Sequence, residues 1–284
     1  MKVILVPVAD RPECVLALRA AFELAKQQDG NVVGCHVRPH RPEGKAGFAG
    51  MLPEDDVYRW LEQAESAQLN SEAARALFTR MTNRYGFVTV KRPRLGKSSL
   101  ALWYEMVGTP SKILAIVGGA ADIAVVSRPK AGSTGPARAF LLATLLYSGR
   151  PVLVLPQRRV ATLGERVLIA WNQSQEAAGA VSAALPILRR AAEVTFIAAG
   201  PENRPGPKAS FMCDYLAHWG IKADRVATKG DDPEREILET FEARGSDLLV
   251  MGACHRTRLS ELVFGGVTRR LLFEANVPAL MYHR

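Results

Sequence analysis

The chain has 284 residues, of which 48% are hydrophobic and 23% are charged, and its formal net charge is +9. This composition is typical of a folded globular protein, and the length suits one large α/β domain or two small ones. No apolar run approaches the roughly 18 residues of a membrane span. We therefore expect no membrane partner. No zinc-finger, homeodomain or RNA-recognition signature accompanies the positive charge, so we expect no dedicated nucleic-acid binding.

The cysteines and the first residues indicate a reducing compartment. Cys14, Cys35, Cys213 and Cys254 lie far apart in the chain and form no Cys-x-x-Cys pair. This spacing argues against a disulfide framework and against a structural zinc site. Residues 1–7 form too short an apolar run for a secretory signal. We therefore predict a cytoplasmic protein.

Short apolar runs alternate with helical patterns in the first half of the chain. A helix is expected to start at residues 10–12, with Asp10 as its cap and Pro12 in its first turn. Residues 39–53 are rich in glycine and proline and predict a loop. The other expected elements are strands at residues 2–8, 31–37, 100–107, 122–127 and 151–155 and helices at residues 54–85, 113–120 and 137–147.

The same order of elements returns in the second half, after a basic linker at residues 157–164. A loop rich in proline and glycine is expected at residues 201–207. The expected strands are at residues 167–171, 194–198, 225–229, 248–251 and 278–282, and the expected helices at residues 174–191, 209–219, 232–245 and 268–275.

Three short segments of the first half match segments of the second half. They pair 108–110 with 230–233, Asp122-Ile-Ala-Val-Val with Asp247-Leu-Leu-Val-Met, and Arg150-Pro-Val-Leu-Val with Val277-Pro-Ala-Leu-Met. The sequence therefore predicts an internal duplication of an α/β unit and two doubly wound parallel-sheet domains, at residues 1–157 and 165–284.

One short motif resembles a phosphate-binding loop but lacks the spacing that such a loop requires. Gly96-Lys97-Ser98-Ser99 resembles the end of a Walker phosphate loop, but that motif needs a glycine at position 91, where the chain has Lys91. It also needs a helix directly afterwards, where we expect a strand. A basic loop is the better interpretation.

The stretch at residues 246–270 is the strongest candidate for a binding site. An apolar run ends at Gly252, a basic loop follows, and Gly265-Gly266 come just before the last helical pattern. Glycines that open a helix leave backbone N–H groups facing outward, where the helix dipole favours an anion. The stretch by itself fits a phosphate or nucleotide cradle and a simple tight turn equally well.

Taken together, the motifs resemble those of a tandem-domain universal stress protein, and the resemblance covers nearly the whole chain. The stretches that carry it are 103–108, 148–156, 167–177, 247–253, 264–269 and 277–281. The resemblance implies two five-stranded doubly wound domains of the adenine nucleotide alpha-hydrolase-like type. It also implies that the last strands of the two domains pair and form an intrachain pseudo-dimer, and further dimerisation stays open.

The resemblance also implies an ATP or other adenine-nucleotide site in the second domain. Nucleotide-binding members of this family use Gly-x2-Gly-x9-Gly-Ser/Thr and an Asp at the end of the first strand. This chain departs at three positions, with His255 for the second Gly, Gly266 for Ser/Thr and Asn172 for the Asp, so we expect weaker binding. The predicted site residues are Ala170, Trp171, Asn172, Gly252, His255, Gly265, Gly266, Val267 and Thr268.

The first domain matches this pattern less well. Ala9 stands where the Asp belongs, and the loop after Ser127 lacks the glycine spacing. We expect it to serve as the structural partner of the second domain.

The chain lacks the common catalytic motifs, and we predict that it is not an enzyme. There is no Gly-x-Ser-x-Gly elbow and no Gly-x-Gly-x-x-Gly after either first strand. Neighbours such as Cys35 and His36 point to opposite faces of a strand, so we predict no metal beyond one that accompanies a nucleotide. Asp122 and Asp247 stand at strand ends, where capping roles are expected. The alternative function is an interaction scaffold with a vestigial site, whose sheet edge or basic surface contacts a partner protein.

Overall fold

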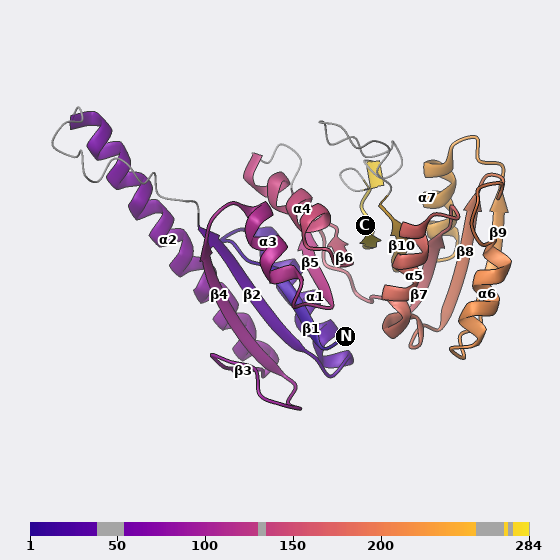
Figure 1. The fold of residues 1–284 in the computed structure, drawn as a ribbon, viewed down its shortest axis with the longest axis horizontal. Coiled ribbons are helices and arrows are strands. Elements are labelled where there is room, and N and C mark those ends of the chain that lie inside the picture. The colour runs from indigo at the N-terminus through magenta and orange to yellow at the C-terminus, as the bar shows by residue number, and fades with distance from the viewer. Residues whose placement is uncertain (39–53, 130–134, 254–269, 272–274, 284) are drawn as a thin grey trace. The chain divides into compact units, whose positions relative to one another are not determined.

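The computed structural model describes residues 1–38, 54–129, 135–253, 270–271 and 275–283, with the backbone alone at 54–69 and 135–136. Within these residues, the structure has seven helices and eleven strands (Figure 1). The helices are α1 (Pro12–Gln27), α2 (Glu54–Tyr85), α3 (Pro110–Gly118), α4 (Gly135–Tyr147), α5 (Gln175–Leu188), α6 (Ala209–Ala217) and α7 (Pro233–Ala243). The strands are β1 (Val3–Pro7), β2 (Asn31–Arg38), β3 (Val88–Thr89), β4 (Leu100–Val107), β5 (Ile123–Ser127), β6 (Val152–Leu155), β7 (Arg166–Ala170), β8 (Glu193–Ala199), β9 (Asp224–Thr228), β10 (Leu248–Gly252) and β11 (Ala279–Tyr282).

The contacts divide the chain into two compact units, Met1–Val125 and Val126–Arg284. The domain boundary expected between residues 157 and 165 follows the internal repeat rather than these contacts, and it stays a prediction. Among the described helices, none combines the length and the apolar character that crossing a membrane requires.

The first unit is a parallel sheet in the order β3-β4-β2-β1-β5. Its longest pairing joins β2 to β4, from Val32 opposite Ala101 to Arg38 opposite Val107. The helix α1 packs on β1 and β2, and α2 packs on α1 and β2. The strands β1 and β2 have almost entirely buried side chains, as expected of parallel strands covered on both faces.

An aromatic cluster fills the space between α1, α2 and the sheet. The Phe22 ring stacks on Tyr85 with centroids 5.4 Å apart and meets Phe87 edge-on at 4.9 Å. The Phe78 ring lies over β2 at Gly34, where a Cβ would stand 2.6 Å from ring carbons. The glycine therefore lets an aromatic ring approach the strand backbone directly.

The second unit holds the sheet order β6-β11-β10-β7-β8-β9. All its pairings are parallel except that of β11 with β6, which is antiparallel and brings Leu280 opposite Leu153. Pairing of the last strands of the two repeats is therefore confirmed.

The chain winds outward from β7 through β8 to β9 and then returns to β10 on the other side of β7. Because such crossovers are right-handed, α5 and α6 cover one face of this sheet and α7 covers the other.

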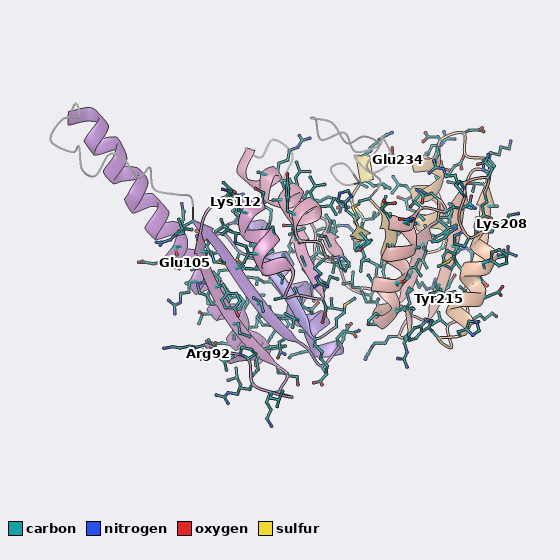
Figure 2. The ribbon with its side chains drawn as sticks, viewed as in Figure 1. Arg92, Glu105, Lys112, Lys208, Tyr215 and Glu234 are labelled. Carbon is teal, nitrogen blue, oxygen red and sulfur yellow. The ribbon has the colours of Figure 1, made fainter. Side chains whose placement is uncertain are left out.

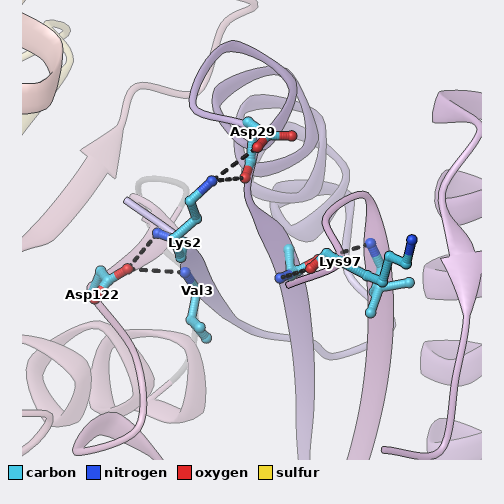
Figure 3. Close-up of polar contacts among 7 residues, drawn as sticks. Lys2, Val3, Asp29, Lys97 and Asp122 are labelled. Carbon is cyan, nitrogen blue, oxygen red and sulfur yellow. Dashed lines mark hydrogen bonds and ion pairs between the residues drawn. The ribbon is translucent and has the colours of Figure 1, made fainter. Parts of the chain in front are cut away.

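Each repeat is fastened at the amino end of its first strand by one aspartate. In the first unit, the Asp122 carboxylate accepts hydrogen bonds from the backbone N–H groups of Lys2 and Val3, at 3.0 Å for Val3 (Figure 3). In the second, Asp247 accepts from Gly164, Glu165 and Arg166 at 3.0, 3.1 and 3.0 Å. The capping role expected for both aspartates is confirmed.

A buried arginine secures the approach to the last strand. Arg128, 3% exposed, donates from Nη1 to the Val277 carbonyl at 2.6 Å and from Nη2 to the Leu271 carbonyl at 2.8 Å. Burial lowers the pKa of its guanidinium to about 10. Arg128, which follows β5, thus holds the segment that leads into β11 of the second repeat.

The sequence reading needs two corrections in the first unit. Asp10 does not cap α1, because the helix begins at Pro12 and the cap position falls on Arg11, whose side chain makes no capping bond. The short strand β3 was not anticipated, since two exposed residues carry no periodic signal. The loop expected at residues 39–53 lies outside the described residues.

We predict that Asp247→Ala lowers the free energy of unfolding by about 2–3 kcal/mol, because three backbone N–H groups lose a charged acceptor. Urea denaturation measures this change. The exposed Glu242 on α7 offers a control, whose replacement by alanine should stay within about 0.5 kcal/mol of the parent. Equal stabilities of the two variants would contradict the fastening role of Asp247.

Candidate functional site

The candidate site lies where the strand order reverses in the second unit. The strands β7 and β10 are parallel neighbours, with Ala170 opposite Met251, and the crossovers that leave them run in opposite directions. Such a switch point leaves an opening at the carboxyl ends of the strands, where α/β proteins bind ligands. Asn172 follows β7 and Gly252 ends β10, so the fold brings these two predicted site residues to neighbouring strand ends.

Trp171 belongs to the core rather than to the surface of this opening. Its side chain is 3% exposed and meets Phe196 edge-on, with centroids 5.9 Å apart. Its backbone N–H donates to the Ile197 carbonyl, and its indole N–H donates to the Pro207 carbonyl at 3.0 Å. The indole thus ties the end of β7 to the loop at residues 200–208.

Asn172 is the exposed polar residue at the end of β7. Its Oδ1 accepts from the Ser174 N–H at 3.2 Å, which shapes the turn into α5. Ser174 in turn caps α5 by accepting from the Ala177 N–H at 3.0 Å. The first turn of α5 is therefore ordered at the switch point.

Gln173, which the sequence reasoning missed, holds the loop beside the site. It is 6% exposed and has a left-handed backbone with φ of 61°. Its Nε2 donates to the Gly206 carbonyl at 2.9 Å, and its Oε1 accepts from the Arg204 N–H at 3.0 Å. A left-handed conformation costs a non-glycine residue about 1–2 kcal/mol, which these bonds offset. The glycine- and proline-rich loop at 201–207 was the available signal that something packs here.

Gly252 is required by packing, whatever binds nearby. A Cβ at this position would stand 2.5 Å from the Ala177 nitrogen and 2.8 Å from the Glu176 carbonyl carbon. Both are backbone atoms in the first turn of α5, which cannot move without shifting the helix. The absence of a side chain therefore lets α5 approach the end of β10 directly.

The carboxyl ends of β8 and β9 are closed by backbone contact. Gly200 follows β8 and Gly230 follows β9, both with positive φ, and a Cβ on Gly230 would lie 2.5 Å from the Gly200 Cα. Two loops can pass this closely only where neither carries a side chain.

A carboxylate of the chain itself fills the turn after β9. Glu236 on α7 accepts from the backbone N–H groups of Gly230, Asp231 and Asp232 at 2.9, 3.0 and 3.4 Å, and from the Thr228 hydroxyl. Successive N–H groups of this kind form an anion-binding nest. The hydrogen bond from Thr228, followed by those from the backbone, lowers the pKa of Glu236.

An ion pair connects α7 with the segment that follows the glycine-rich stretch. The Glu234 side chain, labelled in Figure 2, is largely buried in the first turn of α7 and lies 2.9 Å from the Arg270 Nε. The predicted site residues His255, Gly265, Gly266, Val267 and Thr268 lie outside the described residues. Among the predicted set, the structure thus places Ala170, Trp171, Asn172 and Gly252.

At the corresponding edge of the first unit, side chains bond to the backbone that follows β1. The Ala9 N–H, at the position of the family's Asp, donates to the Cys14 Sγ at 3.4 Å. His36 donates from Nδ1 to the Val8 carbonyl at 2.8 Å, and its ring stacks near Trp103. Burial raises the pKa of Cys14, and it raises that of Cys35 to about 12, so both thiols are protonated at neutral pH.

No group of three or more His, Cys, Asp or Glu side chains in the described part of the chain is arranged to hold a metal ion. The three cysteines described there, Cys14, Cys35 and Cys213, are free thiols.

Comparison with known proteins identifies similar sequences. A model of the Universal stress protein family matches residues 1–93 and 164–283. A universal stress protein of Methanocaldococcus jannaschii is 35% identical over 63 residues, and a second from the same organism is 32% identical over 65. These matches cover 22% and 23% of this chain and 36% and 40% of the relatives, so the chain spans well under half of their lengths.

Solved structures resemble the whole chain. A universal stress protein from Archaeoglobus fulgidus has a TM-score of 0.68 at 15% identity, covering 99% of this chain and 98% of its own. A putative universal stress protein from Pseudomonas aeruginosa has a TM-score of 0.54 at 17% identity, covering 99% and 93%. At these identities the likeness establishes the fold alone.

We predict that Gly252→Ala destabilises the protein by about 1–3 kcal/mol, because the new methyl group displaces the first turn of α5. Thermal and urea unfolding measure the loss. Gly119→Ala is the matched control, since its Cβ would meet nothing closer than 3.9 Å and its backbone is already helical. An unchanged stability in Gly252→Ala would show that packing does not require the glycine.

We also predict that Glu236→Gln lowers the melting temperature at pH 7 and that the difference fades in acid. The pKa of Glu236 lies below its ordinary 4.5 in the folded state, so its ionisation stabilises the fold above that value. This stabilisation is lost as the pH falls through the lowered pKa. Melting curves between pH 7 and pH 3 test this, with Glu239→Gln on the exposed face of α7 as control. A difference that persists unchanged at pH 3 would contradict the ionic origin.

Proposed function

This chain belongs to the universal stress protein family, and we propose that it is a stress-response protein that binds an adenine nucleotide at the switch point of its second repeat. The observation that carries the proposal is the position of Asn172 and Gly252 at the carboxyl ends of neighbouring parallel strands. The remainder of the glycine motif follows Gly252 directly in the sequence.

The residues of the proposed site have the chemistry that a nucleotide needs. Asn172 is exposed and carries both an amide donor and an amide acceptor, which suit the ribose hydroxyls or the base edge. The motif residues Gly265 to Thr268 supply backbone N–H groups and a hydroxyl suited to phosphate oxygens. His255, in place of a glycine, offers a ring that can stack on a base or donate to a phosphate.

Weak binding is part of the proposal. Asn172 lacks the negative charge of the family's Asp, and Gly266 lacks the hydroxyl of its Ser/Thr. Each lost polar contact weakens binding by about 1 kcal/mol, or roughly fivefold. We place the protein in the cytoplasm and assign it a binding role rather than an enzymatic one, with domains at residues 1–157 and 165–284.

A second candidate function is an interaction scaffold that uses no nucleotide. The observation in its favour is that the chain fills part of its own carboxyl edge, with Glu236 in the nest after β9 and Gln173 holding the 201–207 loop. In that case, a protein partner would bind independently of ATP.

Calorimetric titration with ATP at up to millimolar concentration tests the proposal. The parent should bind weakly, and the variant Asn172→Asp/His255→Gly/Gly266→Ser, which restores the family motif, should bind at least about tenfold more tightly. Gly265→Asp should abolish the heat of binding, because the added carboxylate would repel the phosphate groups of ATP.

A thermal-shift series on the same proteins gives an independent readout. Absence of both heat and thermal shift in the parent and in the restored variant would overturn the nucleotide proposal and leave the scaffold. Phosphate release above the buffer rate would contradict the binding-only role.

A further inference from the structure

The loop between β3 and β4 carries a concentrated positive charge with an apolar tip. We call residues 91–98 the basic loop. It contains Lys91, Arg92, Arg94 and Lys97 and no acidic residue. Residues 91–97 are all exposed, and Leu95 is 103% exposed, so its side chain touches nothing in the chain. Arg92 extends away from the sheet into solvent (Figure 2).

The base of this loop is firmly attached to the sheet. Asn31 at the start of β2 accepts from the Leu100 N–H at 2.9 Å and donates to the Lys97 carbonyl at 3.4 Å (Figure 3). The Ser99 N–H donates to the Gly30 carbonyl at 3.0 Å, and the Ser98 side chain bonds Asp29. The loop is therefore a fixed projection rather than a loose tail.

The tip of the loop is a tight turn. The Lys97 N–H donates to the Arg94 carbonyl at 3.1 Å, and Gly96 has a φ of 67° that suits glycine. Leu95 stands within this turn, between Arg94 and Lys97 in the sequence, so the turn exposes an apolar side chain between cations.

The charges of the basic loop are available to an external partner. Arginines elsewhere pair with carboxylates, as Arg38 does with Glu105 at 3.0 Å and Arg244 with Glu193 at 3.4 Å. Across the described residues, no ion pair involves any of the four basic-loop cations. Like charges held this close repel one another, and an anionic surface relieves that repulsion.

We propose that the basic loop docks on an anionic lipid surface, with Leu95 inserted among the headgroups and the four cations against lipid phosphates. The sequence-based expectation of no membrane partner rests on the lack of a membrane-spanning run, and surface docking needs no such run. A cluster of cations binds anionic leaflets, and an exposed apolar tip gains from leaving water. Single-stranded nucleic acid would call for aromatic side chains to stack the bases, and the basic loop has none. An acidic peptide would pair with the cations but would leave the exposed Leu95 side chain without an apolar contact.

Co-sedimentation with vesicles of phosphatidylglycerol and phosphatidylcholine tests this on the full-length chain. The parent should bind mixed vesicles at low salt, should not bind pure phosphatidylcholine, and should be released at high salt. Arg92→Glu/Arg94→Glu should weaken binding at least about 25-fold, at roughly fivefold for each lost cation.

The matched control is Arg158→Glu/Arg159→Glu, an exposed pair in the linker that changes the net charge equally. It should bind as the parent does, and all variants should keep the parental melting temperature because the replaced side chains are exposed. Leu95→Ser should weaken vesicle binding severalfold without changing the charge. Absence of parental binding, or equal loss in both double variants, would overturn the proposal. Undiminished vesicle binding by Leu95→Ser would overturn the insertion of Leu95 among the headgroups.

Discussion

One carboxylate at the amino edge of each sheet sets the register of the two strands that form the opening at the other edge. Asp247 immediately precedes β10, and its oxygens hold three backbone N–H groups where β7 begins. The parallel strands β7 and β10 therefore begin at the same level of the sheet, and Ala170 lies opposite Met251. Asp122 does the same for β1 and β5. A change in the register of β7 against β10 would move Asn172 away from Gly252 and disrupt the candidate site. A shift by one residue turns side chains to the opposite face of the sheet.

The fold could be predicted because its signals are local and repeated. Buried runs such as Leu248–Gly252 and capped helix starts such as Ser174 and Asp232 depend on short stretches, and the duplication let each half support the other. The site could be predicted only in part. Trp171 stands at the expected position, yet its indole is in the core. Gln173 and Glu236 were missed because their partners lie in loops whose paths no local pattern specifies.

In the second unit, several side chains around the switch point bond to the chain's own backbone. Gln173 holds the 201–207 loop beside β7, while Glu236 fills the N–H nest after β9. Gly252 allows α5 to sit directly on the end of β10. The side chains of Gln173 and Glu236 are thus committed to the fold, and we propose that Asn172 and the glycine motif contact the ligand. We infer that the family fold can be kept in this way while the residues at positions 172, 255 and 266 depart from the family's nucleotide motif.

Hydrogen exchange of the full chain, measured by mass spectrometry with and without millimolar ATP, tests most directly whether the switch point of the second repeat binds the nucleotide. Amides that follow β7 and β10, at residues 171–176 and 252–253, should exchange more slowly with ATP, because a bound nucleotide orders this edge. The matching amides of the first repeat, at residues 8–14, should be unaffected. Protection confined to the first repeat, or no protection in either, would contradict a nucleotide site between β7 and β10.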